Sequence, residues 1–425
     1  MDEKKMDVTR RSFLKKTATV AGAAAISGMA GNLLSGAPAY AAKGSGPIKI
    51  GVVLPFSRAY KVIGDRVVAG LELALNQAGG AYKGRKFEVI KEDSEMKPNV
   101  GLTKTRKLVD KDKVDFLVGP VSSAVCVAMR NYANEKKVPM IIPTAGNVEL
   151  AGNLYSPYVF RSSISHWIFA HPTGLWVKEN LGDQCFVGGA NYAAGHHEVW
   201  AFTMAFRGKG GKIVGSAYPP LNEKDYAPYL TKLSQSGAPV YFGWFAGNDA
   251  VNYCRQAAQF GLNKKVKMTT TGWFFERNLL MAQKDAALGW HCGFNWAITL
   301  DNPVNKEFVK AYDKFTKNDS NVSVSMSSVH GYDAGQMILK AVDKTGGDTD
   351  SAKIVKALEY MKLDSPRGSV ELDANHDMVQ PMYIGEIVKD GSGVVAKIIA
   401  DMGRWTTPYL GARGINSVGQ PFLVQ

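Results

Sequence analysis

Residues 114–124 read VDFLVGPVSSA and give the clearest indication of the fold class. The apolar run from Val114 to Pro120 has the length of a buried strand, and Ser122 and Ser123 directly after it are typical of a helix start. The next residues, through Lys136, continue as a helical pattern. A buried strand that leads into a helix is the basic unit of a parallel α/β sheet.

The same alternation extends along most of the chain. The strands we expect are 48–55, 86–93, 114–120, 138–145, 184–191, 212–219, 239–245, 266–272 and 290–297. The helices we expect between them include 63–77, 99–111, 123–136, 195–206, 249–261 and 277–287. Nearly continuous Val/Ile/Leu strands predict parallel sheets that helices cover on both faces.

Two interruptions divide this pattern. Residues 155–165 contain proline and serine and show no helix before the next strand. After residue 297 the chain becomes helix-rich, at 305–317, 327–344 and 351–361, and then returns to strands at 370–373, 382–389 and 394–400. We therefore predict an α/β fold of two Rossmann-like parallel-sheet lobes joined by three hinge crossings, near residues 163, 299 and 366. Lobe 1 would be 47–163 plus 299–365, lobe 2 would be 164–298 plus 366–412, and 413–425 would be a tail.

The N-terminus has the pattern of an export signal. Residues 9–15 read TRRSFLK, an arginine pair ahead of the bland apolar run 18–34, and a small-x-small site precedes Ala42. This predicts a twin-arginine signal peptide over residues 1–41 and a periplasmic protein. An uncleaved membrane anchor stays an alternative, because the run has almost the length of a membrane span.

Length and charge limit the remaining possibilities. About 384 residues would follow the signal, which is long for one core and favours two domains. Removing residues 1–41 takes away six basic and three acidic side chains, so the net charge falls from +13 to +10. The remaining charges of both signs are interspersed, which argues against a nucleic-acid partner.

The four cysteines are Cys126, Cys185, Cys254 and Cys292. Their spacing is not that of metal ligands, and each lies in an apolar stretch, so we expect buried thiols. A disulfide that includes Cys185 or Cys292 stays open, because the periplasm is oxidising.

Several segments together resemble one family. They are IGVVLPFS at 50–57, VGPVSSA at 118–124, VPMIIPTA at 138–145, VFRS at 159–162 and GSVELD at 368–373. In this order and spacing, from about residue 47 to 400, the chain resembles the periplasmic solute-binding proteins of the branched-chain amino acid transporter family, which are leucine-binding-protein-like. The resemblance implies two lobes that close over a small solute, which is delivered to an inner-membrane ABC permease and its ATPase. We expect a monomer.

The fold position of the serines predicts an anion site in lobe 1. In open α/β sheets, ligands bind beyond the carboxyl ends of strands, where free N–H groups of helix starts point at them. Ser122 and Ser123 open one such helix, and the next strand ends at Thr144, so these groups suit a carboxylate. The ligand contacts predicted in lobe 1 are Tyr60, Ile63, Val121, Ser122, Ser123, Thr144, Ala145 and Gly146.

Lobe 2 departs from the family's amino acid binders. In those proteins an acidic residue meets the ligand ammonium group just before a glycine, and this chain has Thr271 there. An ordinary α-amino acid is therefore a poorer candidate, although Asp249 or Glu198 could substitute. Aromatic residues gather at the strand ends instead, which favours an apolar or aromatic ligand body. The contacts predicted in lobe 2 are Tyr192, Ala194, Phe245, Thr271, Trp273 and Trp296.

Signals for catalysis are weak. His196 and His197 are neighbours that diverge on a helix and so do not share a metal ion easily. Residues 208–211, GKGG, follow a helix and precede a strand, the wrong order for a phosphate loop. His166, His171 and His330 fit hinge or surface roles. We therefore expect a binding protein for a small carboxylate, not an enzyme, without cofactor or metal. An amino acid or amide binder, a ligand-sensing subunit for a membrane receptor, and an extracytoplasmic hydrolase remain the alternatives.

Overall fold

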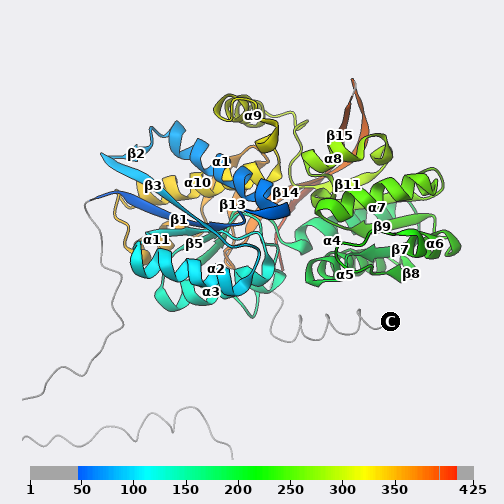
Figure 1. Cartoon of the computed structure of the whole chain (residues 1–425), viewed down its shortest axis with the longest axis horizontal. Coiled ribbons are helices and arrows are strands. Elements are labelled where there is room, and N and C mark those ends of the chain that lie inside the picture. The colour runs from blue at the N-terminus through cyan, green and yellow to red at the C-terminus, as the bar shows by residue number, and fades with distance from the viewer. Residues whose placement is uncertain (1–45, 392, 409–425) are drawn as a thin grey trace, which may run out of the picture. The chain divides into compact units, whose positions relative to one another are not determined.

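The computed structural model describes residues 46–391 and 393–408 (Figure 1). The expected signal peptide, and the tail from residue 413, lie outside these residues. In the described part, no helix combines the length and the apolar character that a membrane crossing needs.

Lobe 1 is built on a six-stranded sheet that is parallel except for one short edge strand. In order across the sheet its strands are β2 (Ala81–Tyr82), β3 (Arg85–Asp93), β1 (Ile48–Leu54), β4 (Phe116–Val118), β5 (Met140–Ile142) and β6 (Val159–Arg161). The central strand β1 is buried except at Lys49, as expected of a strand with helices on both faces.

Helices cover both faces of this sheet. One face carries α1 (Lys61–Gln77), α10 (Met326–Lys344) and α11 (Ser351–Leu358); the other carries α2 (Pro98–Arg106) and α3 (Ser123–Lys136). In Figure 1, α1 and α10 lie side by side, and α9 (Pro303–Phe315) packs near their ends. A Cβ on Gly70 would lie 2.0 Å from the Ser328 carbonyl oxygen, and one on Gly331 equally close to that of Val67. Glycine at both positions therefore permits the close packing of α1 on α10.

Lobe 2 contains a mixed sheet. In order across it run β12 (Lys362–Ser365), β13 (Gly368–Leu372), β14 (Met378–Asp390), β11 (His291–Phe294), β10 (Lys267–Thr271), β9 (Val240–Trp244), β7 (Gln184–Gly189) and β8 (Lys212–Ala217), and β15 (Gly393–Trp405) pairs with β14. Strands β11, β10, β9, β7 and β8 are parallel. One face packs on α4 (His166–Asn180) and α5 (Ala193–Gly208), and the other on α6 (Ala227–Gln235), α7 (Gly247–Gln259) and α8 (Arg277–Gln283).

The two-lobed α/β fold is confirmed, with two differences in detail. The segment 155–165 contains strand β6, and helix α4 follows at once with Pro172 inside it, which hid the helix from the sequence pattern. In addition, Val370, Leu372 and Met378 pack in the core of lobe 1, although β13 and β14 are hydrogen-bonded in the lobe 2 sheet.

Buried polar side chains join the hinge segments. Arg367 is fully buried and donates to the carboxylate of Asp333, to the side-chain oxygen of Gln380 and to the carbonyl of Ser162. The amide of Asn295 donates to the same Gln380 oxygen over 2.8 Å. One guanidinium and one glutamine therefore connect all three crossings, and burial is offset by several charge-assisted hydrogen bonds.

Candidate functional site

The lobe 1 side of the site follows from sheet topology. Strands β1, β4 and β5 are parallel neighbours, so their carboxyl ends and the residues after them share one edge. This edge carries Tyr60, Ser123 and Thr144. Ser122 is used differently, because its Oγ accepts the Val125 N–H over 3.5 Å as the cap of helix α3. The Thr144 hydroxyl is buried and has no hydrogen-bond partner among the described residues.

Arg161 fixes the loop after β5. Its guanidinium, 1% exposed, donates to the carbonyls of Ala145, Ile164 and Asn147 and to the Asp377 carboxylate. These carbonyls therefore turn toward Arg161. Sequence reasoning missed this residue, since no local signal shows that an arginine in a strand holds a neighbouring loop.

The lobe 2 side lies at the carboxyl ends of β7, β9 and β10. Trp244 is 3% exposed, and its ring centroid lies 5.7 Å from those of Tyr192 and His166. Its indole Nε1 is buried without a partner among the described residues. Trp244 was not among the predicted contacts, and strand alternation alone left the choice between it and Phe245 open.

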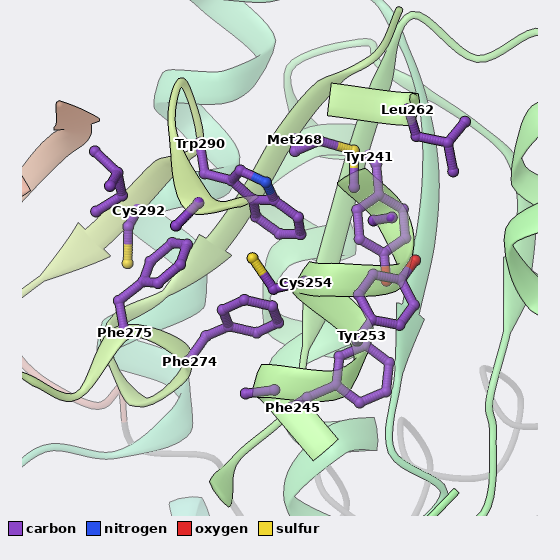
Figure 2. Packing of buried hydrophobic residues seen from close by; sticks show 14 of the residues in the cluster. Tyr241, Phe245, Tyr253, Cys254, Leu262, Met268, Phe274, Phe275, Trp290 and Cys292 are labelled. Carbon is purple, nitrogen blue, oxygen red and sulfur yellow. The ribbon is translucent and has the colours of Figure 1, made fainter. Parts of the chain in front are cut away.

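Phe245 does not lie in this group, which corrects the prediction. It is fully buried in the core of lobe 2 beside Tyr253 (Figure 2). Its ring stacks on that of Tyr253 at 4.4 Å and lies edge-on to that of Tyr226 at 5.7 Å between centroids. Neighbouring strand residues point to opposite faces, so Trp244 and Phe245 cannot both face the same side.

An acidic side chain lies beside Thr271, a possibility that the sequence left open. Glu198, from α5, is fully buried. Its Oε2 accepts the Thr271 hydroxyl over 3.2 Å, and its Oε1 lies 2.9 Å from His166 Nδ1. Of the two substitutes considered from the sequence, Glu198 is the one found here. Both of its oxygens are already engaged.

The surroundings of this pair favour its neutral form. Burial raises the pKa of Glu198 well above its usual range, although the Thr271 hydrogen bond opposes this rise. Burial lowers the pKa of His166, and the charges of His197 and Arg161 act in the same direction. Burial therefore disfavours the charged form of both side chains.

His166 also touches lobe 1. A Cβ on Gly146 would lie 2.8 Å from His166 Nε2 and 2.9 Å from two ring carbons. The backbone N–H of His166 donates to the Gly146 carbonyl over 3.0 Å. The lack of a side chain at Gly146 therefore allows the imidazole ring of His166 to pack against this loop. No sequence signal distinguished His166 from a hinge histidine.

Tyr60 approaches lobe 2 from the other lobe. Burial raises the pKa of Tyr60, and the charge of Asp249 adds to the rise. Burial also raises the pKa of Tyr192, with contributions from Tyr60, Asp249 and Glu198. Tyr60, from lobe 1, and Tyr192, from lobe 2, are therefore close enough for the charge of one to affect the pKa of the other. Asp249 itself accepts the Asn222 N–H over 3.0 Å, which occupies one of its oxygens.

The remaining predicted contacts have the following neighbours. Trp273 packs edge-on to Phe169 and His330 in the cluster near the hinge, and Ala194 belongs to the same cluster. Trp296 donates to Asn305 over 2.7 Å and lines a separate cavity of about 510 Å³. Val121 packs against the lobe 1 core, and Ile63 is half-buried on α1.

Polar contacts hold the two lobes together beside the site. Arg66 of α1, 1% exposed, donates to Asn278 of lobe 2 over 2.7 Å and to Ser323 of lobe 1 over 2.9 Å. Its Nη1 lies 3.8 Å from Glu276 Oε2, and the Ser327 hydroxyl donates to Glu276 over 3.0 Å. We call Arg66, Glu276 and Asn278 the interlobe latch.

The four cysteines are buried free thiols. Burial raises the pKa of the Cys126 thiol to about 12, and it raises those of the other three as well. They are therefore core residues and do not take part in the site.

Lobe 1 carries the buried Thr144 hydroxyl, which has no partner among the described residues, and lobe 2 carries a group of aromatic side chains at its strand ends. These features are typical of proteins that hold a small molecule between two α/β lobes. Comparison with known proteins agrees. Residues 47–392 match the family model described as periplasmic binding protein, so the chain belongs to that family. The family is extracytoplasmic, and the chain is the solute-binding component of an ABC transporter.

Curated and solved relatives cover most of the chain. The Leu/Ile/Val-binding protein homolog 6 of Brucella melitensis is 27% identical over 350 residues, which span 81% of this chain and 89% of that protein. A solute-binding protein from R. palustris, solved with 4-hydroxybenzoate, is 26% identical with a TM-score of 0.79, covering 84% of this chain and 97% of the other. Another from R. palustris, solved with benzoate, is 27% identical with a TM-score of 0.77 and the same coverage.

Proposed function

We propose that this protein captures a small carboxylate with an aromatic or apolar body and hands it to an inner-membrane ABC permease and its ATPase. Closure of the two lobes would enclose the ligand. The carboxylate would lie against Thr144 and the start of α3, and the body against Tyr60, Tyr192 and Trp244.

One observation carries this proposal: the acidic group of lobe 2 is already satisfied. Glu198 has one oxygen on Thr271 and the other on His166, so an ammonium group would have to compete with these two contacts for the same oxygens. The buried Thr144 hydroxyl, by contrast, lacks a partner among the described residues and suits an anion. A buried donor left unpaired costs about 1–3 kcal/mol, which a ligand carboxylate would recover. That two similar proteins were solved with benzoate and 4-hydroxybenzoate adds support.

An amino acid is the second candidate, because an acidic side chain does lie beside Thr271. Binding an ammonium group there would require Glu198 to ionise and leave His166. The Leu/Ile/Val-binding names of the curated relatives are in keeping with this alternative.

A thermal-shift screen separates the two candidates. The panel contains benzoate, 4-hydroxybenzoate, phenylacetate, aliphatic acids, amino acids and amides. A ligand at one hundred times its dissociation constant stabilises the protein by about 2.7 kcal/mol, which is easily measured. We expect the aromatic acids to raise the melting temperature most. Stabilisation by leucine or valine, without an effect of any aromatic acid, would overturn the proposal.

The export route and the oligomeric state belong to the same proposal. Residues 1–41 would direct export through the twin-arginine route, and the exported protein would be a monomer. Changing both Arg10 and Arg11 to lysine in the full-length precursor should keep it in the cytoplasm, as read by cell fractionation. Unchanged export would contradict this route. Light scattering on the purified protein checks the monomer.

A further inference from the structure

A cavity of about 510 Å³ lies between helix α8 and the β14–β15 hairpin, which are close together in Figure 1. Thr144, Tyr192 and Trp244 of the candidate site do not line it. We propose that this cavity is a second ligand site, which takes a medium-chain alkyl carboxylate with its chain inside and its carboxylate at the exposed rim. The inference goes beyond the proposed function, because it concerns a different site and a different ligand.

The buried part of the cavity lining is apolar. Phe275, Phe294, Trp296 and Met326 line it, and each is at most 5% exposed. The indole N–H of Trp296 already donates to Asn305 over 2.7 Å, so this ring offers the ligand only apolar surface. The volume is within the range of about 300–1,000 Å³ that is common for small-molecule pockets. An alkyl chain that displaces water from these side chains is therefore stabilised by the hydrophobic effect.

The rim of the cavity is its exposed lining, formed by Arg277, Met281, Lys284, Asp285, Asp390 and Gly393. Arg277 is the first residue of α8, and Lys284 directly follows this helix. Neither cation has a hydrogen bond or an ion pair among the described residues. Met281, on the same helix, is 60% exposed. The rim thus combines cations with apolar surface, as the head and the first methylene groups of an alkyl carboxylate require.

The carboxylates of the lining are mostly neutralised. Glu276 lies 3.8 Å from the guanidinium of Arg66, and Asp285 forms an ion pair with Lys389 at 2.5 Å. Asp390 has no such partner among the described residues, and its charge opposes an anion. Two unpaired cations therefore stand against one unpaired carboxylate, which favours an anionic head group over an ammonium group.

The backbone at Lys284 points to a role for its side chain. Its φ of 52° and ψ of −136° are close to the first central position of a type II′ turn, where glycine is the usual residue. A lysine in this conformation is strained, and strain of this kind is concentrated at functional sites. A contact between the ammonium group and a ligand accounts for a lysine at this position.

Calorimetry with octanoate and octan-1-ol tests the charged rim, because the two ligands share the chain and differ in the head group. In Lys284→Gly we expect octanoate affinity to fall about fivefold, the upper range for an exposed ion pair, and octanol affinity to fall less than about twofold. The melting temperature should not fall, because glycine relieves the strain. Lys317→Gly is the matched control, since Lys317 is also an exposed lysine at positive φ, 54°, but does not line the cavity. Unchanged octanoate affinity in Lys284→Gly, or no octanoate binding to the wild type, would overturn the inference.

A filling variant locates the ligand. Val395 is half-buried and lines the cavity, so Val395→Trp should abolish binding of both octanoate and octanol. Saturating benzoate should leave octanoate binding unchanged. Displacement by benzoate, or octanoate binding that survives in Val395→Trp, would place the alkyl acid elsewhere and refute the second site. If benzoate does not bind while octanoate behaves as expected, the proposed function fails and the second site stands.

Sedimentation with phosphatidylglycerol vesicles separates a free acid from a membrane lipid with the same chemistry of an alkyl chain and an anionic head. We expect the protein to remain in the supernatant and octanoate to bind. Co-sedimentation that Val395→Trp abolishes would assign the cavity to a membrane lipid, and the free acid would be the wrong ligand.

Discussion

Replacing Arg66 with methionine removes the central group of the interlobe latch. Methionine fills a similar volume but leaves Glu276, which is 5% exposed, without its opposite charge, and Asn278 without its donor. Breaking a buried pair by removing one partner costs about 3–5 kcal/mol. Burial already raises the pKa of Glu276, so this side chain can escape part of the cost by taking up a proton. We therefore use the lower value, about 3 kcal/mol.

This cost applies only when the lobes are closed, because opening hydrates both groups. The substitution therefore destabilises the closed state by about 3 kcal/mol relative to the open state. Because the ligand binds tightly only to the closed state, the apparent affinity for the ligand should fall by about 100-fold. Calorimetry with benzoate measures the affinity, and small-angle scattering measures the compaction at saturating ligand. Lys61→Met is the control, since Lys61 lies on the same helix and forms only an exposed pair with Asp65. If Arg66→Met binds benzoate as tightly as the wild type, the latch does not contribute to closure.

Three further predictions concern single side chains. Ser123→Ala should weaken benzoate binding about tenfold in calorimetry, whereas Ser122→Ala should chiefly lower the unfolding free energy, by about 1 kcal/mol, since it caps α3; the reverse ranking would exchange their roles. Thr271→Glu should weaken benzoate binding and destabilise the protein, because it places a second carboxyl group beside buried Glu198; tighter benzoate binding in this variant would contradict the assigned cleft chemistry. Burial lowers the pKa of His171 from 6.5 to about 4, so the unfolded state binds the proton first and stability should fall as pH drops from about 6.5 to about 4, by about 1 kcal/mol for this half-buried ring. Urea titrations should show a steeper slope in the wild type than in His171→Phe, because burial also lowers the pKa of His166 and His330 and these two groups contribute in both proteins.

Periodicity and composition were enough to predict the architecture. The expected strands at 48–55, 184–191 and 239–245 correspond to β1, β7 and β9, because buried parallel strands are continuous apolar runs. Helix α4 was not predicted because Pro172 interrupts its sequence pattern, although tertiary packing keeps the helix intact. β13 is hydrogen-bonded in the lobe 2 sheet while its Val370 and Leu372 pack in the lobe 1 core, and the sequence does not show that a short hinge strand contacts both lobes.

Fewer features of the site could be predicted from the sequence, because they depend on tertiary packing. Positions that follow a strand could be placed at the cleft edge, and Thr144 and Tyr192 were predicted on that basis. Whether Trp244 or Phe245 contacts the site depends on which of them points to the site face of the sheet. Two adjacent aromatic residues give no indication of this, because successive side chains point to opposite faces. Glu198 lies on helix α5 and Thr271 lies on strand β10, 73 positions apart in sequence. Only the packing of α5 on the sheet brings the two side chains together.

The most direct test of the central claim compares phenylacetate with L-phenylglycine in the same calorimetry experiment. The two ligands share a carboxylate and a phenyl ring and differ only in an α-ammonium group. Because the carboxyl group of Glu198 is already bonded to His166 and Thr271, we expect phenylacetate to bind at least tenfold more tightly. Tighter binding of L-phenylglycine would mean that Glu198 is free to receive an ammonium group, and the account of the site would be wrong.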